Sequence, residues 1–377
     1  MCVAVYFDAR KAFNSVDRNI LLNKMMDEYQ FDPCYVNMFS NYLSNCSIRI
    51  KGKTKLYPNQ TGVAQGAALG PLLYTMFINS VSNIINVPHL LYADDLVIYL
   101  GGDSLADIVD RLQNVTNSIE QWCKDHNVML NADKTFWQVF HKPKHNLHIG
   151  NDVTLKLNGQ NIERVKVFKY LGVEIDSNLS FMQQFDKVSK KVSSGLGYMY
   201  SIKRNLTEHV MKMLLCSYVL SYIEYCTEIW LVQTDLTILP LQKKLDRFLV
   251  AYYYPSLVKK KGDINVSPLW DKLAIMFVKE KYELTLLNGA FQLFKGKGSD
   301  SEDIGKDNDK DKDAVISKFI LPKHKSELYK KNDLQYRQML AWNLLPRSMS
   351  ANSTGPMFNF LCTQILMNRR KSKVDPL

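Results

Sequence analysis

Long hydrophobic runs are missing from this sequence of 377 residues. The most apolar stretch, around residues 210–230, is interrupted by Lys212, Glu224 and Glu228, so it does not predict a membrane span. The apolar residues 1–7 lead straight to Asp8 with no basic segment before them, which argues against a secretory signal. We therefore expect an intracellular protein with no membrane partner, in a nuclear or cytoplasmic location that the sequence does not distinguish.

Paired cysteines and an acidic surplus are also missing. The 7 cysteines are scattered and form no Cys-x-x-Cys pair, a pattern that predicts reduced thiols rather than a disulfide framework. Lys and Arg number 48 against 37 Asp and Glu, which gives a formal net charge of +11. A surplus of this size favours a polyanionic partner such as nucleic acid, because cationic side chains release counterions from phosphates. An ordinary basic protein would have the same composition.

Residues 1–176 alternate between short apolar strands and amphipathic helices, which predicts an α+β fold, an antiparallel sheet with packed helices. Residues 1–7 form one expected strand that ends at Asp8. Residues 89–100 form two more, joined across Ala93-Asp94-Asp95. Further strands are expected at 135–140, 153–158, 161–166 and 168–175, and a hairpin at 48–56. Three helices are expected: one capped by Asn14 or Ser15, one over 72–85, and one capped by Ser104 with Asp107.

The rest of the chain is different in character. Residues 177–297 have an almost continuous helical pattern. Residues 298–313 are rich in acidic side chains and poor in large apolar ones, which predicts a disordered linker. A smaller apolar region, 314–377, closes the chain.

Three carboxylates are expected to meet at one edge of the sheet. Asp8 ends one strand, and Asp94 and Asp95 lie at the tip of a hairpin that can pair beside it. Like charges this close repel unless cations lie between them, and oxygen ligands suit Mg²⁺ better than zinc. The alternative for Asp8 alone is an ordinary surface turn; apolar strands on both sides make that alternative weak for the Asp94-Asp95 pair.

Five segments in order resemble the motifs of reverse transcriptases. They are VAVYFDARKAFNSVD (3–17), TGVAQGAALGPLLYTMFIN (61–79), YADD (92–95), LNADKT (130–135) and KYLGVEID (169–176). The form of the first two is similar to that of non-LTR retrotransposons (LINE, jockey-like) rather than retroviruses. The resemblance departs from the usual pattern at Asn14, Ala64 and Ala67, which could alter the turn that shapes the nucleotide pocket.

This resemblance implies RNA-directed DNA synthesis on an RNA template from a DNA primer, with deoxynucleoside triphosphates as substrates. It implies that Asp8, Asp94 and Asp95 ligate two Mg²⁺ ions, for which Mn²⁺ could substitute. The other residues to which it gives roles are Phe13 as the steric gate against a ribose 2′-hydroxyl, Gln65 and Gly66 beside the incoming nucleotide, Lys134 as the acid near the pyrophosphate, and Leu171 and Gly172 as the primer grip.

Past residue 176 the resemblance is looser. Residues 177–297 look like the helical thumb of these enzymes, and 334–349 look like the tail that follows it in jockey-like elements. The family's fingers precede the first motif, whereas this chain begins seven residues before Asp8. We therefore expect a truncated palm that binds Mg²⁺ or nucleic acid more readily than it polymerises, with apolar surface exposed around Val3 and Val5.

Two alternatives remain beside this interpretation, and one further signal is discounted. An RNA-directed RNA polymerase would share the palm, although Phe13 and the Gln-Gly turn argue against it. A catalytically silent remnant would at most bind nucleic acid. The spacing of Cys123, His126, His141 and His145 imitates a zinc finger, but the residues between them already fit the fourth motif.

Overall fold

The computed structural model describes residues 1–44, 46–49, 51–52, 54–141, 153–231, 234–257, 265–297, 333–345 and 355–372. The chain divides into two compact units: Met1–Tyr170 with Glu174–Ser180, and Leu171–Val173 with Phe181–Leu377. The predicted acidic linker, 298–313, lies outside the described residues. Across the described ranges, no helix combines the length and the apolarity needed to cross a membrane.

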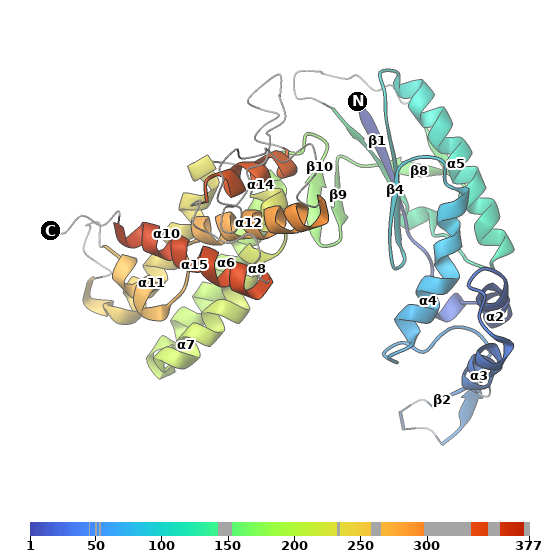
Figure 1. Cartoon of the computed structure of the whole chain (residues 1–377), viewed down its shortest axis with the longest axis horizontal. Coiled ribbons are helices and arrows are strands. Elements are labelled where there is room, and N and C mark those ends of the chain that lie inside the picture. Colours follow the sequence, from blue (N-terminus) through green and yellow to red (C-terminus); the bar gives the residue numbers. More distant parts are fainter. Residues whose placement is uncertain are drawn as a thin grey trace, which may run out of the picture. The chain divides into compact units, whose positions relative to one another are not determined.

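A six-stranded sheet in the order β4-β5-β1-β6-β8-β7 forms the centre of the first unit (Figure 1). Its strands are β1 (Cys2–Phe7), β4 (His89–Tyr92), β5 (Asp95–Gly101), β6 (Phe136–Phe140), β7 (Leu155–Leu157) and β8 (Gln160–Arg164). All the pairs are antiparallel as predicted, except that β6 and β8 run parallel. The α+β interpretation is confirmed.

The central strand β1 corrects one expectation. Val3 and Val5 were expected to be exposed, yet both have 0% of their surface accessible. Pairing with β5 along one edge and with β6 along the other makes β1 a central strand, and both of its faces are covered by packed side chains. Both valines also belong to the main hydrophobic core, together with the buried stripe of the long helix α5 (Leu105–Asp125). The apolar sequence of β1 therefore reflects burial on both faces of a central strand.

Helix α5 begins as the sequence predicts, since Ser104 Oγ accepts a hydrogen bond from the Asp107 backbone N–H. The other helices of this unit are α1 (Ala12–Ser15), α2 (Arg18–Asp27), α3 (Pro33–Leu43) and α4 (Gly70–Ile78), which continues as a 3₁₀ helix over Asn79–Ile84. The cap expected at Asn14 or Ser15 is wrong. Asp17 caps α2, because its carboxylate accepts from the backbone N–H groups of Asn19 and Ile20.

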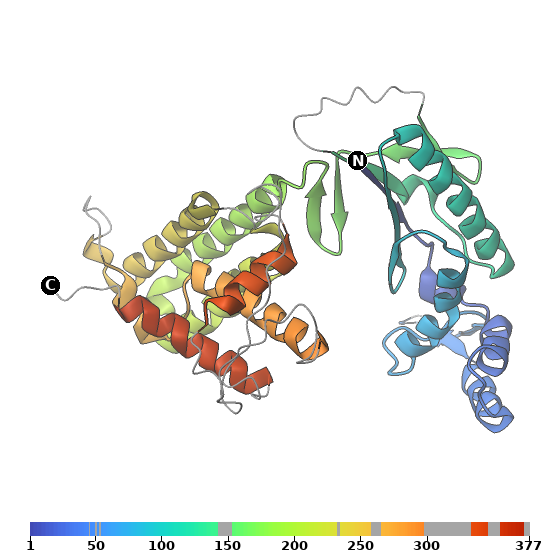
Figure 2. The same ribbon diagram turned by 45° about the horizontal axis from the view of Figure 1, so that its top comes forward.

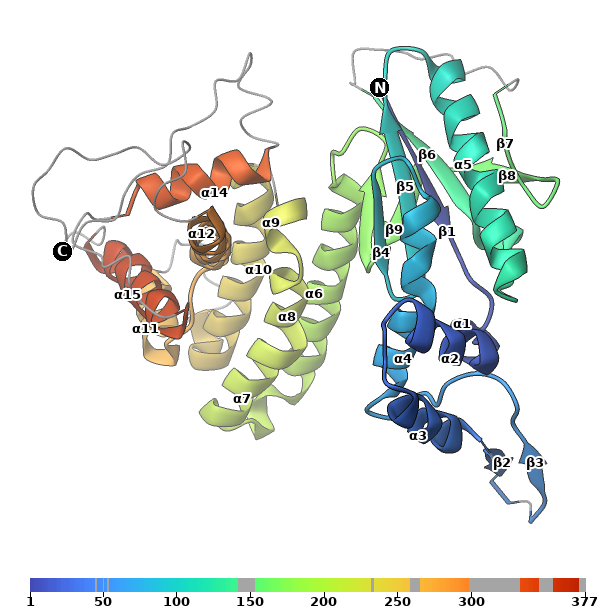
Figure 3. The ribbon, with the colours of Figure 1, turned by 45° about the vertical axis from the view of Figure 1, so that its right-hand side comes forward.

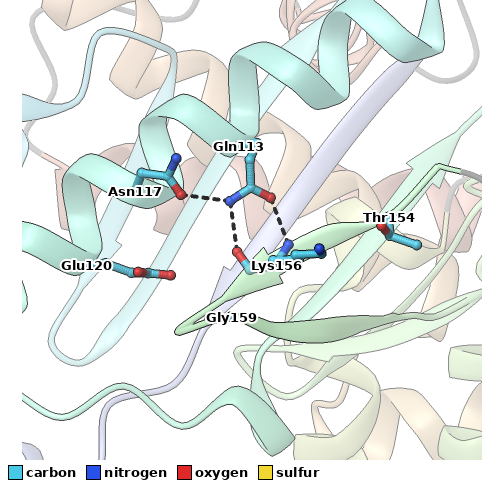
Figure 4. A pocket seen from close by; sticks show the side chains of 6 residues that line it. All are labelled: Gln113, Asn117, Glu120, Thr154, Lys156 and Gly159. Carbon is cyan, nitrogen blue, oxygen red and sulfur yellow. Dashed lines mark hydrogen bonds between the residues drawn. The ribbon is translucent and has the colours of Figure 1, made fainter.

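The β7–β8 hairpin is fastened to α5 by side chains that line a shallow pocket (Figure 4). Gln113 donates to the Lys156 carbonyl oxygen at 3.0 Å and accepts from the Lys156 N–H at 2.7 Å. Glu120 accepts from the Asn158 N–H at 2.5 Å. These polar groups are paired with one another, so the pocket serves to anchor the hairpin.

Two smaller hairpins complete the first part of the chain. The expected single strand at 168–175 is wrong: β9 (Val167–Tyr170) and β10 (Val173–Asp176) form a two-stranded sheet. Leu171 and Gly172, with φ of 43° and 88°, form the turn between them. The predicted hairpin near 48–56 is confirmed as β2 (Ser47–Arg49) and β3 (Leu56–Pro58).

The second unit is helical, as its sequence predicts (Figure 2). Its longer helices are α6 (Met182–Ile202), α7 (Glu208–Leu214), α10 (Thr234–Tyr253), α11 (Ser267–Leu273), α12 (Val278–Lys297), α14 (Leu334–Asn343) and α15 (Gly355–Ser372). Shorter turns, α8 (Ser221–Glu224) and α9 (Thr227–Trp230), lie between α7 and α10. The C-terminal helices share one core with α12, in which Phe291 stacks on Phe358 with ring centroids 4.4 Å apart.

Candidate active site

Asp8 lies where β1 ends, and the fourth motif fixes its backbone. The Asp8 N–H donates to Thr135 Oγ1 at 3.4 Å, and the Asp8 carbonyl accepts from the Asn131 N–H at 2.9 Å. Thr135 is fully buried, and its hydroxyl donates to the Asn131 carbonyl at 2.9 Å. Segment 130–135 therefore acts on the site through Asp8, a role that spacing alone does not reveal.

Asp94 and Asp95 lie at the tip of the β4–β5 hairpin. Tyr92 pairs with Asp95, so the turn consists of Ala93 and Asp94, both exposed. Ala93 has a φ of 53°, a left-handed conformation that usually favours glycine. Because Phe7 pairs with Leu96 in the adjacent strand, Asp95 stands beside the end of β1, where Asp8 follows.

The three carboxylates interact electrostatically. Burial raises the pKa of Asp95, and the negative charges of Asp94 and Asp8 raise it further. Such repulsion is relieved when a cation lies among the carboxylates, and three hard oxygen donors fit a divalent ion such as Mg²⁺. Within the described residues, no three His, Cys, Asp or Glu side chains converge closely enough to form a ready-made metal group. The shared ligand set therefore stays a prediction.

Phe13 is linked to Asp94 and Asp95 by Tyr74, whose ring contacts Phe13 and whose hydroxyl senses the charge of the two carboxylates. The two rings stack with centroids 4.6 Å apart, and Tyr74 is 2% exposed on α4. Burial raises the pKa of Tyr74, and the charges of Asp94 and Asp95 contribute in the same direction. The Tyr74 hydroxyl has no hydrogen-bond partner among the residues that the structure describes. Sequence reasoning missed Tyr74, because an aromatic residue in an apolar helix looks like any other core residue.

Arg18 organises the chain that leads into the second motif, and sequence reasoning missed it too. Its guanidinium donates to the carbonyls of Gly62 at 2.9 Å, Leu43 at 2.7 Å, Asn59 at 2.9 Å and Thr61 at 3.1 Å. Such a side chain was indistinguishable in the sequence from any surface arginine.

Backbone hydrogen bonds fasten the same segment to the first motif. The Gly62 N–H donates to the Val16 carbonyl at 2.8 Å, and the Val63 N–H donates to the Phe13 carbonyl at 2.9 Å. Gly62 has a φ of 81°, and a Cβ there would lie 2.7 Å from the Asn14 Cα. Only glycine fits this position, because any side chain would clash with the backbone of Asn14. The first two motifs are therefore packed directly against each other.

The predicted nucleotide-contact residues, Gln65 and Gly66, lie in an exposed turn that follows this anchored segment. Gly66 has a φ of 81° with open space where a Cβ would be. The turn forms with Ala64 and Ala67 in place, since the Ala67 N–H donates to the Ala64 carbonyl at 3.4 Å. Both predicted residues are therefore accessible from solvent.

The remaining predicted residues lie elsewhere. Lys134 is exposed on a 3₁₀ turn (Ala132–Lys134) in the segment that holds Asp8. Leu171 and Gly172 belong to the second unit, where the Tyr225 hydroxyl donates to the Leu171 carbonyl at 2.6 Å. In the discounted zinc set, Cys123 is buried and His126 stacks on Trp122 at 4.0 Å, so both serve packing. His145 lies outside the described residues.

Comparison with known proteins agrees with the motifs. Residues 1–175 match the family model described as reverse transcriptase (RNA-dependent DNA polymerase). The chain is 26% identical over 199 residues to the RNA-directed DNA polymerase from mobile element jockey of Drosophila melanogaster, covering 50% of this chain and 21% of that protein. It is 27% identical over 195 residues to the probable RNA-directed DNA polymerase from transposon BS of the same species, covering 48% and 20%.

The matched part thus spans about a fifth of the length of these relatives. Among solved structures, the apo telomerase of Candida tropicalis is similar with a TM-score of 0.37 and 13% identity, covering 80% of this chain and 52% of that one. The telomerase of Candida albicans in complex with a fragment of telomeric RNA gives a TM-score of 0.36 and 12% identity, covering 70% and 50%.

Proposed function

We propose that this chain is the polymerase core of a jockey-like, non-LTR retrotransposon, because its residues 1–175 match the reverse transcriptase family model and its relatives include polymerases of such elements. The proposed reaction is RNA-directed DNA synthesis by nucleotidyl transfer to a primer 3′-hydroxyl. The observation that carries it is the neighbouring placement of Asp8, Asp94 and Asp95 at the ends of β1 and the β4–β5 hairpin; burial raises the pKa of Asp95, and the charges of Asp94 and Asp8 add to that effect. Paired carboxylates of this kind at a strand end serve phosphoryl transfer.

In this proposal, the three carboxylates hold Mg²⁺, with Mn²⁺ as a possible substitute. Bound there, the two ions supply charge that activates the 3′-hydroxyl and stabilises the leaving pyrophosphate. The protein contributes placement: Thr135 and Asn131 fix the backbone of Asp8, and the two-residue turn at Ala93 presents Asp94. Placement matters because a shift of about 1 Å can cost ~100-fold in rate.

The substrate contacts in this proposal come from the anchored second motif and its neighbours. Phe13, backed by Tyr74, excludes the 2′-hydroxyl of a ribonucleotide. Gln65 and Gly66 lie beside the incoming deoxynucleoside triphosphate and the template base. Lys134 donates a proton toward the pyrophosphate, and Leu171 with Gly172 supports the DNA primer on the RNA template.

The test compares Asp94→Asn with Asp110→Asn, an equal loss of charge at an exposed position on α5. Two readouts are needed: Mg²⁺ binding by calorimetry, and extension of a DNA primer on an RNA homopolymer. We expect Asp94→Asn to weaken Mg²⁺ binding at least tenfold and to abolish any extension, because a divalent ion loses a charged ligand. Equal behaviour of the two variants in both readouts would remove the basis of the proposal.

A further inference from the structure

Within the described residues, the strands of the β2–β3 hairpin are exposed on both faces. Figure 3 shows it extending beyond α3, away from the six-stranded sheet. Its two strands pair only with each other, and all six strand residues are exposed. The exposed fractions include 54% for Ile48, 51% for Leu56 and 36% for Tyr57. An isolated two-stranded sheet is only marginally stable in water, and exposed apolar side chains are typical of interaction sites. We therefore expect this hairpin to bind a partner.

The base of the hairpin, by contrast, is firmly held. The Asn59 N–H donates to the Cys46 carbonyl at 2.8 Å, which closes the two ends of the hairpin on each other. Arg18 donates to the Leu43 and Asn59 carbonyls on either side of it. The bare strands therefore project from a fixed anchor that also carries the second motif.

The side chains on one face form a set suited to nucleotides. Ile48 pairs across the strands with Tyr57, so the two side chains share a face. Lys55, two residues before Tyr57, lies on the same face with its Nζ 5.4 Å from the ring centroid. An exposed aromatic ring beside a cation is the combination that stacks a base and neutralises its phosphate.

The charge of this region is one-sided. The sequence from Pro33 to Ala93 contains no Asp or Glu, whereas the hairpin segment carries four cations, of which Arg49, Lys51 and Lys55 belong to the described residues and Lys53 does not. In the described part of the chain, no ion pair involves any of these three residues. A segment that carries cations and no carboxylate complements a polyanion better than a protein surface on which both signs of charge are mixed.

We propose that the β2–β3 hairpin binds a single nucleic-acid strand through Tyr57, Ile48 and Lys55, with Arg49 and Lys51 contacting phosphates. The proposal rests on the proposed function for the kind of partner, since a polymerase must hold a template. The hairpin proposal adds a second nucleic-acid contact surface, which lies on a different part of the first unit from Asp8, Asp94 and Asp95.

The test measures the affinity of the whole chain for a fluorescently labelled single-stranded RNA of about 20 nucleotides by anisotropy, at several salt concentrations. The first variant is Arg49→Gln with Lys51→Gln and Lys55→Gln. Its matched control is Arg111→Gln with Lys124→Gln and Lys156→Gln, exposed cations of the same unit. Both sets lower the formal net charge by three, from +11 to +8.

We expect the hairpin variant to bind at least tenfold more weakly and the control to change less than threefold. The dependence of log affinity on log salt should fall by about 2 in the hairpin variant, at roughly 0.7 for each phosphate that the protein no longer neutralises. Tyr57→Ala should weaken binding roughly tenfold with the salt dependence unchanged, because it removes stacking alone. Exchanging Arg for Lys and Lys for Arg at the three positions should preserve binding.

Other outcomes overturn the proposal. Equal weakening in the hairpin and control variants would show a general charge effect, and no binding by the unmodified chain would remove the partner. If the unmodified chain instead self-associates in sedimentation and Ile48→Ser with Leu56→Ser abolishes this, the hairpin is a protein interface. None of these results bears on the Asp94→Asn comparison of Mg²⁺ binding, so failure of the hairpin proposal is distinguishable from failure of the proposed function.

Discussion

The Phe13 ring stacks on the Tyr74 ring, with centroids 4.6 Å apart and planes inclined by 18°. Phe13 comes from the first motif and Tyr74 from the helix that follows the Gln-Gly turn of the second, so this contact joins the two. Burial raises the pKa of Tyr74, and the charges of Asp94 and Asp95 contribute in the same direction. The proposed sugar gate is therefore held by a buried ring that borders the carboxylates.

We predict that Phe13→Ala increases ribonucleotide incorporation at least about tenfold relative to deoxyribonucleotides, because the side chain that excludes the 2′-hydroxyl is gone. Primer extension with each nucleotide class, in a polymerase that carries this palm, measures the ratio. Tyr74→Leu should shift the ratio in the same direction, since it removes the ring that backs Phe13. Phe39→Ala, a partly buried ring of the same unit, is the control. Unchanged sugar discrimination in Phe13→Ala would reject the gate.

Thr135→Val tests how Asp8 is held. The substitution keeps the shape of the side chain but removes the acceptor for the Asp8 N–H and the donor to the Asn131 carbonyl. We expect the free energy of unfolding to fall by about 1–3 kcal/mol, since the partly buried Asp8 N–H loses its acceptor, while the Asn131 carbonyl keeps only the Lys134 N–H as donor. Mg²⁺ affinity should fall as well. A control is Thr116→Val, whose buried hydroxyl donates only within α5. Mg²⁺ affinity equal in both variants would show that Thr135 supports the fold without positioning Asp8.

Arg18→Lys should loosen the second motif. The planar guanidinium reaches four carbonyls at once, whereas a lysine ammonium offers a single point charge that cannot span them. We expect faster hydrogen exchange at the Gly62 and Val63 amides, and a lower melting temperature. Arg111→Lys, at an exposed position on α5, should leave both unchanged. Protection of the two amides equal to that of the unmodified chain would contradict the anchoring role.

Asp246→Asn gives a pH-dependent prediction in the second unit. Burial raises the pKa of Asp246, although its carboxylate accepts from Gln242 and Trp270 at 2.8 Å each. A carboxyl whose folded pKa lies above its unfolded value destabilises the fold as the pH rises past the unfolded pKa of about 4. The asparagine variant should therefore melt higher than the unmodified chain at neutral pH, and the difference should vanish below about pH 4. A lower melting temperature of the variant at neutral pH would reverse the argument.

Much of the first unit was determined by local sequence. An apolar run that ends at Asp8, an apolar hairpin interrupted by Asp94-Asp95, and Ser104 three residues before Asp107 each specify their structure through near neighbours. The structure agrees with all three, because strand and helix periodicity and capping depend on residues only a few positions apart. The five motifs also carry the resemblance to reverse transcriptases, since their order along the chain is itself a property of the sequence.

Only the tertiary structure decided what depends on distant partners. Val3 and Val5 are buried because β5 and β6, about a hundred residues later in the chain, make β1 a central strand and α5 contributes to the core that covers its face. Arg18 became an anchor through carbonyls that follow it by more than twenty residues. The contact between Tyr74 and Phe13 depends on the packing of α4 in the core of the first unit, which brings the first and second motifs together. Contacts between positions so far apart are set by the packing of whole elements, and the local pattern contains no signal for them.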